Sequence, residues 1–377
     1  MAHVLVTGGA GFIGSALSAR LLESGHKLRI LDCLSPQIHG PAATPPAWIA
    51  DAGVEFLQGS VEDRGAFERA LEGVEIVVHL AAETGTGQSM YEIARYNGVN
   101  SQGAANLLDI VASQTHRTLQ RVILTSSRSI YGEGAYARVD GARVTPPARS
   151  ARQLAERIWE PLDEVTGEVL RAVPTRESDP PRPASIYAAT KYAQEDLVRI
   201  GCEAFGIGYA ILRLQNVYGE GQSLNNPYTG ILSIFSTRIR RGITLPLFED
   251  GEESRDFVHV EDVVGAISAC IETPEAPDAV VNVGSGVATS VRSVAESLSR
   301  AFGRQADLVI TGEYRLGDIR HNWADISQLR ERLGYEPRID LDTGLRRFAD
   351  WVSAQPLPED LLDKANNELK ARNLMRA

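Results

Sequence analysis

A glycine-rich turn at residues 7–14 constrains the fold more than any other feature of this 377-residue chain. The turn follows an apolar run at 4–6 and opens a helical pattern, so it joins a strand directly to a helix. Gly8, Gly11 and Gly14 allow a tight turn, close approach of a ligand to the backbone and close packing of helix on strand. Free N–H groups at such a helix start face a pyrophosphate, which predicts a dinucleotide site.

The first half of the chain alternates short β-branched runs with helical patterns. The predicted strands span residues 3–6, 27–31, 54–57, 76–80, 121–125 and 209–214. The predicted helices span residues 13–24, 64–71, 100–113 and 186–205. This alternation predicts an α/β fold, a Rossmann-type doubly wound parallel sheet, whose ligand lies at the carboxyl ends of the strands.

The rhythm breaks twice along the chain, which sets the expected domains. Residues 133–183 are rich in Pro, Arg and Glu, with one helical pattern at 151–158, and are expected to form an insertion over the active face. Later helical patterns span 231–241, 261–271, 291–302 and 344–354. We expect a dinucleotide-binding Rossmann domain at 1–215, rejoined by a segment at about 256–273, and a smaller α/β substrate-binding lobe at 216–377. The tail at 358–377 is expected to be an amphipathic helix packed on the surface or at a subunit contact.

Composition excludes several other classes of protein. The net charge of −11 and the scattered basic residues argue against a nucleic-acid or anionic-membrane surface. Cys33, Cys202 and Cys270 form no metal-like pair, which argues against a disulfide framework and fits a reducing cytoplasm. No apolar run reaches the roughly 20 residues of a membrane span, and no signal-peptide pattern precedes the first strand. We therefore expect a cytoplasmic protein that is neither exported nor anchored.

Candidate cofactor-binding residues follow the second, third and fourth predicted strands. Asp32 ends the second strand, where a carboxylate can accept hydrogen bonds from a ribose diol and repel a 2′-phosphate; this favours NAD over NADP, although Asp32 could be an ordinary strand-end carboxylate. Ser60 and Val61 follow the third strand, where an adenine ring would lie. The fourth strand ends in mostly small residues, Leu80, Ala81, Ala82 and Thr84. Such residues let a cofactor pass close to the backbone, but ordinary tight packing would explain the alanines equally well.

Tyr187 and Lys191 lie four residues apart in a predicted helix, so their side chains share one face. An ammonium beside a phenol favours the ionised phenol, so this tyrosine could take or give a proton near neutral pH. The fifth strand delivers Ser127 close to the phenol, although a serine run at a strand end is often only a turn. The combination predicts proton transfer beside a bound dinucleotide.

The motifs also carry a family resemblance, in order and over nearly the whole chain. They are TGGAGFIG, HLAA, TSSRSIYG, YAATK, RLQNVYG, RDFVHVEDV, NVGSG and RLGDIRHNWAD. With them the chain resembles the extended short-chain dehydrogenase/reductases that act on nucleotide sugars. It is most similar to the 4-epimerases of nucleoside-diphosphate sugars, the UDP-glucose and particularly the dTDP-L-rhamnose 4-epimerase-like branches, through QSMYEIARY (88–96), NNPYTG (225–230) and FEDGEESRDF (248–257).

The resemblance implies an NAD-dependent isomerase that epimerises C4 of a UDP, dTDP or GDP sugar through a transient 4-keto intermediate. Tyr187 would be the base, Ser127 would hold the C4 hydroxyl, and Lys191 would bind the nicotinamide ribose and lower the pKa of the phenol. The implied cofactor site also includes Phe12, Ile13, Asn100 and Thr125. The implied substrate site comprises Ser127, Arg128, Asn216, Asn226, Phe248, Arg255, Arg315 and Asp318. The family also implies a homodimer joined by the helices at 100–113 and 186–205.

Other reactions of the family remain open to different degrees. Its sugar dehydratases carry an Asp-Glu pair after the Ser/Thr and its uronate decarboxylases a Glu, whereas Arg128 and Ser129 stand here. Dehydration is therefore not expected, and decarboxylation is disfavoured. A net nucleotide-sugar dehydrogenase or 4-ketoreductase, an epimerase/decarboxylase of a nucleotide uronic acid, and a regulatory NAD-binding protein remain alternatives. Arg128 would contact an anionic or highly hydroxylated sugar, or turn outward to pair with a carboxylate of the insertion.

The insertion departs from the suspected branch. Relatives there carry two Cys-x-x-Cys pairs resembling a zinc ribbon, and the matching positions here are Ala137, Asp140, Asp163 and Thr166. Tetrahedral structural zinc sites are built from Cys and His ligands. We therefore expect no metal in this protein.

Overall fold

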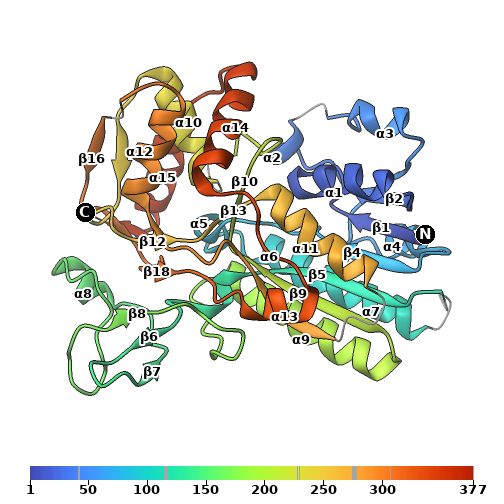
Figure 1. Cartoon of the computed structure of the whole chain (residues 1–377), viewed down its shortest axis with the longest axis horizontal. Coiled ribbons are helices and arrows are strands. Elements are labelled where there is room, and N and C mark those ends of the chain that lie inside the picture. Colours follow the sequence, from blue (N-terminus) through green and yellow to red (C-terminus); the bar gives the residue numbers. More distant parts are fainter. Residues whose placement is uncertain are drawn as a thin grey trace.

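A computed structural model describes residues 1–40, 43–113, 118–226, 228, 230–273, 278–305 and 307–376. Two lobes lie side by side, a larger one that contains the N-terminus and a smaller one toward the C-terminus (Figure 1). No helix in these described ranges combines the length and the apolar character needed to cross a bilayer.

Among the described residues, seven parallel strands form the central sheet in the order β14-β9-β5-β4-β1-β2-β3. They are β1 His3–Thr7, β2 Lys27–Asp32, β3 Glu55–Gln58, β4 Ile76–His79, β5 Arg121–Ser127, β9 Gly208–Leu214 and β14 Ala279–Val283. The order reverses between β1 and β4, so a ligand crevice is expected beyond the carboxyl ends of these strands. The predicted fold class is confirmed. The segment at 256–273, which was expected to return to the sheet, contributes α11 (Val260–Glu272) to one of its faces, and the edge strand β14 follows it in the sequence.

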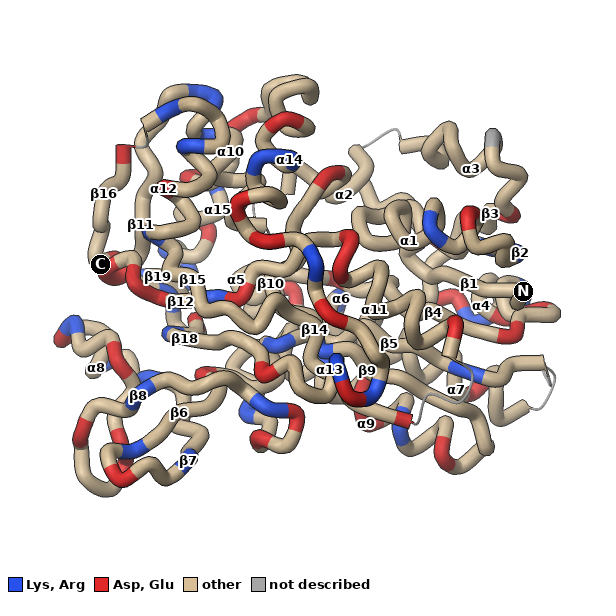
Figure 2. The backbone as a smooth tube through the Cα atoms, viewed as in Figure 1, with Lys and Arg blue, Asp and Glu red and all other residues tan. Residues whose placement is uncertain are grey.

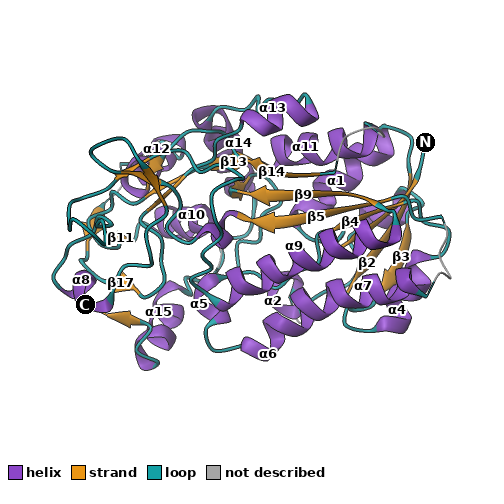
Figure 3. Ribbon diagram, turned by 90° about the horizontal axis from the view of Figure 1, so that it is seen from below, coloured by secondary structure: helices purple, strands orange, loops and turns teal. Residues whose placement is uncertain are grey.

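Helices cover both faces of the sheet because alternate strand residues point in opposite directions (Figure 3). Val4 and Val6 pack in one layer with α1, α11 and α13, whereas Leu5 packs in the other with α4, α7 and α9. The first layer comprises α1 Phe12–Glu23, α11 Val260–Glu272 and α13 Ser327–Leu333. The second comprises α4 Arg64–Leu71, α7 Gly103–Ala112 and α9 Ile186–Phe205. Short helices α2 Pro36–His39, α3 Ala47–Asp51, α5 Thr86–Ser89 and α6 Ile93–Tyr96 lie between these elements.

Local sequence signals set the ends of the helices that matter for the site. The Ser185 hydroxyl caps α9 by accepting a hydrogen bond from the Ala188 N–H, and Gly206 ends the helix in the left-handed region (φ 68°). This cap places Tyr187 in the first turn of α9. The helix predicted at 100–113 starts earlier than expected, because α6 continues through a π-helical turn at Asn97–Gln102 into α7. Such turns are frequent at functional sites.

The smaller lobe packs three amphipathic helices around its own core. They are α10 Ile231–Arg241, α12 Val291–Ala301 and α14 Leu341–Ala354, and their apolar faces meet at Phe235, Leu298 and Phe348. Its short strands are β10 Asn216–Tyr218, β11 Leu245–Leu247, β12 Ser254–Arg255, β13 Phe257–His259, β15 Thr289–Ser290, β16 Leu308–Ile310, β17 Tyr314–Arg315, β18 His321–Asn322 and β19 Met375–Arg376. The tail forms α15 Leu362–Ala371 and then pairs β19 with β17; Ala377 lies outside the described residues.

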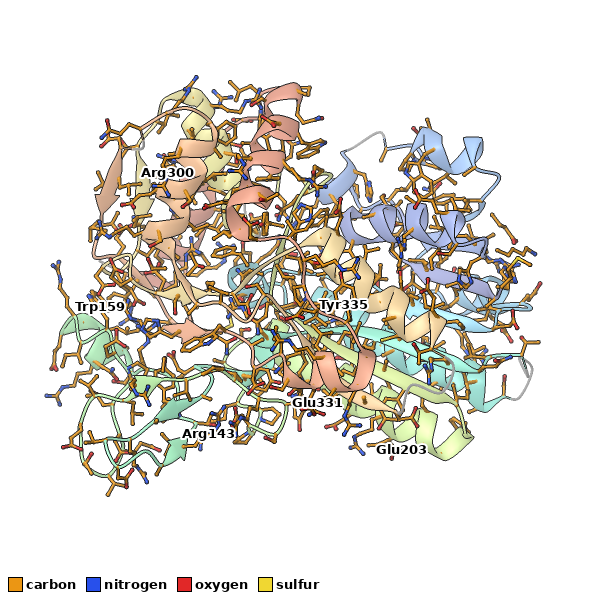
Figure 4. All side chains as sticks on the ribbon, in the orientation of Figure 1. Arg143, Trp159, Glu203, Arg300, Glu331 and Tyr335 are labelled. Carbon is orange, nitrogen blue, oxygen red and sulfur yellow. The ribbon has the colours of Figure 1, made fainter. Side chains whose placement is uncertain are left out.

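The insertion is a small sheet beside the smaller lobe, with acidic and basic residues interspersed along it (Figure 2). Its strands β6 Tyr136–Ala137, β7 Arg143–Val144 and β8 Arg171–Ala172 pair in the order β7-β6-β8, and α8 Ala151–Ala155 is shorter than predicted. Trp159 is labelled on the insertion in Figure 4. It contacts Tyr314 of the lobe, with ring centroids 6.3 Å apart.

A buried ion network also ties the insertion to the smaller lobe. We define this insertion network as Glu133, Arg149, Glu249 and Arg320. Arg149 donates hydrogen bonds to Glu133 (3.0 Å) and Glu249 (2.8 Å), and Arg320 lies 3.2 Å from Glu249. The insertion therefore buttresses the lobe.

Asp163 and Asp140, two of the positions that the sequence analysis compared with a zinc ribbon, make other interactions. The Asp163 carboxylate pairs with Arg138 at 2.5 Å and accepts hydrogen bonds from the backbone N–H groups of Val165 and Thr166. Asp140 accepts a hydrogen bond from the N–H of Ala142. In the described ranges, no cluster of three or more His, Cys, Asp or Glu side chains is arranged to hold a metal ion.

Candidate active site

The glycine-rich turn is a cradle that side chains would fill. Gly8 has φ +70°, and a Cβ there would lie 2.9 Å from the backbone N of Ala81. A Cβ on Gly14 would lie 2.4 Å from the carbonyl oxygen of Gly8. Gly11 caps α1 without a side-chain hydrogen bond, so the N–H groups of the first turn stay free of side-chain caps. The turn therefore has the shape and the donors that a dinucleotide pyrophosphate needs.

The other predicted cofactor residues outside the cavity described next organise the loops around this cradle. The Asp32 carboxylate accepts hydrogen bonds from the N–H groups of Ala10 (3.0 Å) and Leu34 (2.8 Å). Val61 is buried, and the Ser60 hydroxyl accepts a hydrogen bond from the N–H of Glu62. The N–H of Ala81 is held by the Thr7 hydroxyl at 3.2 Å.

Asn100 lies in the π-helical turn and holds the segment after β4. Its side-chain oxygen accepts from the N–H of Glu83 (2.9 Å), and its amide nitrogen donates to the carbonyl of Glu83 (3.1 Å) and to the hydroxyl of Thr190 (3.0 Å). Asn100 thus joins the β4 loop to α9, and it positions this loop without lining the cavity described next.

A cavity of about 380 Å³ opens at the carboxyl ends of the central strands. It brings together most of the predicted cofactor and catalytic residues: Phe12, Ile13, Leu80, Ala82, Thr84, Thr125, Ser127, Tyr187 and Lys191. Arg128 and Asn216 also line it. The i, i+4 spacing in α9 places Tyr187 and Lys191 on the wall of one cavity, as the sequence predicted. We call this space the sugar cavity.

The two ionisable groups of α9 have shifted pKa values. Burial raises the pKa of Tyr187, whereas the Ser127 hydroxyl and the positive charge of Arg128 lower it. Burial lowers the pKa of Lys191 to about 7, partly opposed by Glu195. The positive charge of Arg128 therefore favours the ionised phenol, an effect that the sequence analysis expected of Lys191.

A second cavity, of about 230 Å³, adjoins the first and is lined mainly by the smaller lobe. We call it the nucleotide cavity. It contains the predicted substrate residues Phe248, Arg255, Arg315 and Asp318, and it shares Arg128 and Asn216 with the sugar cavity. The insertion, all of which is described, lines neither cavity, in contrast to the expected flap over the active face.

The two arginines of the predicted substrate site in the smaller lobe, Arg255 and Arg315, differ in how many hydrogen-bond donors they leave for a ligand. Arg255 is engaged by the carbonyls of Ser254 (2.8 Å), Arg320 (2.9 Å) and Ile319 (2.5 Å), and it lies 3.3 Å from the Asp318 carboxylate. Arg315 stacks over the Phe248 ring, 4.4 Å from its centroid, and its Nε is buried without a partner in the described part of the chain. Arg315 is therefore the freer of the two.

Asn226 lies apart from both cavities. Its side-chain oxygen accepts a hydrogen bond from the N–H of Tyr228, so the side chain shapes its own loop. Pro227 and Thr229 of the same motif lie outside the described residues.

Sequence reasoning missed several residues that line the nucleotide cavity. Leu362 and Leu369 of α15 and Leu374 after it form part of the wall. Glu368 accepts hydrogen bonds from the hydroxyls of Tyr91 (2.9 Å) and Tyr228 (2.8 Å). These bonds tie the tail to Tyr228, which lines the nucleotide cavity. The apolar face of α15 was the available signal, but it does not say what the helix packs against.

Glu253 was also missed. It lies two residues before Arg255, lines the nucleotide cavity, and is buried. Burial raises the pKa of its carboxyl group to about 7, and Arg255 opposes this shift. Alternation along an extended strand, which puts residues two apart on the same face, was the signal that could have found it.

The chain is similar to known proteins over nearly its whole length. The model of the NAD dependent epimerase/dehydratase family matches residues 4–152 and 163–284. A dTDP-L-rhamnose 4-epimerase of Burkholderia thailandensis is 40% identical over 355 residues, which cover 93% of this chain and 95% of the relative. The crystal structure of a UDP-glucose 4-epimerase from Thermotoga maritima with UDP-glucose has a TM-score of 0.73 at 29% identity and covers 93% of this chain and 98% of its own. MoeE5 in complex with UDP-glucuronic acid and NAD has a TM-score of 0.73 at 27% identity, with coverages of 93% and 99%.

Proposed function

Because the chain belongs to the NAD dependent epimerase/dehydratase family, we propose that it inverts C4 of a nucleoside-diphosphate sugar with NAD as cofactor. The predicted resemblance and enzyme class are confirmed by relatives that are nucleotide-sugar 4-epimerases. The observation that carries the proposal is the sugar cavity, in which Ser127, Tyr187 and Lys191 meet beside the glycine cradle. No Asp-Glu pair for dehydration follows Ser127.

The residues present fit a dinucleotide. Cβ atoms on Gly8 or Gly14 would fill the cradle, and small or apolar residues lead from it into the sugar cavity. The turn of α1 would hold the pyrophosphate, Asp32 a ribose, and Lys191 the nicotinamide ribose. Held by these residues, NAD would supply the acceptor for the hydride of C4 and the donor for its return.

We propose that Tyr187 accepts the proton of the C4 hydroxyl as the carbon is oxidised, and returns a proton when the 4-keto sugar is reduced on its other face. Ser127 would hold the reacting oxygen. A positioned base and a hydrogen bond to the developing carbonyl are what this reaction requires. The positive charge of Arg128 and the Ser127 hydroxyl both act to stabilise the phenolate, against the effect of burial.

We further propose the division of labour expected from the sequence, with residues 1–215 binding NAD and residues 216–377 binding the nucleotide. The lining of the two cavities supports this division. The edge strand β14 belongs to the central sheet, although its residues fall within 216–377. Asn226, outside both cavities, would act through its loop.

A homodimer in the cytoplasm is part of the proposal. Ile200 and Phe205 of α9 are exposed, which supports association through α7 and α9. The three cysteines are all free, which suits a reducing compartment. Light scattering of the wild type and of Ile200→Glu tests the dimer, and a monomeric wild type would contradict it.

The test of the reaction is inversion at C4 followed by NMR, with UDP-glucose, UDP-glucuronate and a dTDP-linked 6-deoxysugar as substrates and no added cofactor. Tyr187→Phe should slow inversion of the accepted sugar roughly 100- to 10,000-fold, the usual worth of general acid–base catalysis. Tyr192→Phe, on the same helix, is the matched control. An unaltered rate in Tyr187→Phe would refute the assignment of the base, and inversion of no sugar by wild-type protein that retains NAD would refute the function.

A further inference from the structure

Arg128 stands at the meeting point of the two cavities. It begins the 3₁₀ turn Arg128–Tyr131, directly after β5 ends at Ser127, and its side chain lines both the sugar cavity and the nucleotide cavity. A ligand with a sugar in one cavity and a nucleotide in the other must pass this side chain.

The guanidinium of Arg128 is only partly used by the protein. Its Nε donates a hydrogen bond of 2.8 Å to the side-chain oxygen of Asn216. Its Nη1 is buried and has no hydrogen-bond partner within the described ranges. In the same part of the chain no carboxylate lies within 4.0 Å, so Arg128 does not pair with the insertion. Asn216 thus fixes the direction of a side chain whose Nη1 remains available.

A buried guanidinium without a paired anion in this position raises the free energy of the folded protein, because its charge is removed from water. Burial and, to a smaller extent, the nearby positive charge of Arg255 lower the pKa of Arg128 to about 9, with Asp318 partly opposing them. A guanidinium nevertheless keeps its proton in proteins, so the charge persists and its cost is relieved only by an anion. Arg255, whose donors are occupied by backbone carbonyls, leaves this task to Arg128 at the junction.

We propose that Arg128 binds an anionic oxygen of the substrate at the junction of the two cavities. This inference rests on the proposed function, because it takes the ligand to be a nucleoside-diphosphate sugar. Two oxygens of such a ligand have the required chemistry: those of the phosphate next to the sugar, and those of a carboxylate on the sugar itself. Both would accept a hydrogen bond from the unpartnered Nη1, and charge-assisted bonds of this kind are strong.

The experiment is calorimetric binding to the NAD-loaded enzyme, without turnover. The probes are UDP, dTDP, UDP-glucose and UDP-glucuronate. Arg128→Met removes the charge at similar length, and Arg152→Met makes the same change at an exposed arginine that pairs with Glu156. Loss of one charge-assisted hydrogen bond should weaken binding roughly 10- to 100-fold in Arg128→Met and leave Arg152→Met unaltered.

The pattern over the probes identifies the bound group. Equal weakening of all nucleotides assigns Arg128 to the phosphate, and weakening confined to UDP-glucuronate assigns it to a sugar carboxylate. Dissociation constants within threefold of wild type for all four probes, or a wild type that binds none of them, would overturn the proposal. An enzyme that binds through Arg128 but inverts no sugar would fail only the proposed function. If Arg128→Met does not fold, Arg128→Gln, which keeps a polar group near Asn216, undergoes the same measurement with the same criteria.

Discussion

Removing Arg149 from the insertion network should destabilise the protein and weaken nucleotide binding at the same time. The side chain is 1% exposed and donates to the carboxylates of Glu133 and Glu249. It also donates to the carbonyls of Trp159 (3.0 Å) and Asp318 (3.1 Å). Burial would lower the pKa of Arg149, but the two carboxylates raise it well above its usual range, so the charges are tightly coupled.

The expected magnitude follows from what Arg149→Met leaves behind. Glu133 and Glu249 would stay buried with less compensation, and breaking a buried ion pair by removing one partner costs about 3–5 kcal/mol. With an unfolding entropy of about 2.1 cal/mol/K per residue, this chain has about 0.8 kcal/mol/K, so Tm should fall by about 4 to 6 °C. Asp318 lines the nucleotide cavity, and Glu249 directly follows the lining residue Phe248, so the dissociation constant for UDP or dTDP should also rise several-fold.

Differential scanning calorimetry and nucleotide titration check the two effects, with Arg152→Met of the same insertion as the exposed control. Adding Glu133→Gln to Arg149→Met should restore part of the lost Tm, because one unpaired buried charge disappears. A Tm change below 1 °C in Arg149→Met would show that the network contributes little and that the insertion is not a buttress.

Three further predictions concern other parts of the site. Lys191 has a pKa of about 7 in the folded protein and about 10.4 in the unfolded chain, so the unfolded chain binds more protons between these values. The Tm of cofactor-free wild type should therefore rise relative to that of Lys191→Met from pH 7 to 9. Parallel Tm curves would contradict this. Asp32→Asn should raise the affinity for NADP relative to NAD roughly tenfold, because the charge that repels a 2′-phosphate is lost, and an unchanged ratio in fluorescence titrations would count against it. Glu368→Ala should weaken UDP or dTDP binding roughly fivefold or more, because it releases Tyr91 and Tyr228. Glu359→Ala, at an exposed position, is the control. Equal dissociation constants for Glu368→Ala and wild type by calorimetry would show that these contacts of the tail do not support binding.

The parts that sequence predicts well are those in which local chemistry is sufficient. The turn after β1 needs glycine at Gly8 for its positive φ and at Gly14 for lack of space, so the pattern is readable without knowledge of the rest. The spacing of Tyr187 and Lys191 is likewise a property of one helix, and the helix begins where Ser185 caps it.

The parts that were missed depend on packing between distant segments. β14 is a short apolar run whose partner, β9, lies more than sixty residues earlier, and no local signal specifies that pairing. The amphipathic pattern of α15 shows which face is apolar, but not that Leu362 and Leu369 line a ligand cavity. Arg128 was expected either to reach the sugar or to turn outward, and its bond to Asn216 is a tertiary contact that only the fold reveals.

The path of the chain between the lobes has a practical consequence for protein engineering. After β9 ends at Leu214 the chain enters the smaller lobe, returns to the sheet layer as α11 and β14, leaves again, and returns once more as α13. Cutting after Leu214 would remove β14 from one side of β9, while β5 stays paired on the other side. The unpaired backbone groups on the new edge would favour aggregation. A chimera that borrows the nucleotide specificity of a relative would therefore need three separate grafts. Two of them would start and end beside the sheet, and the third would start after α13 and end with β19 in the smaller lobe.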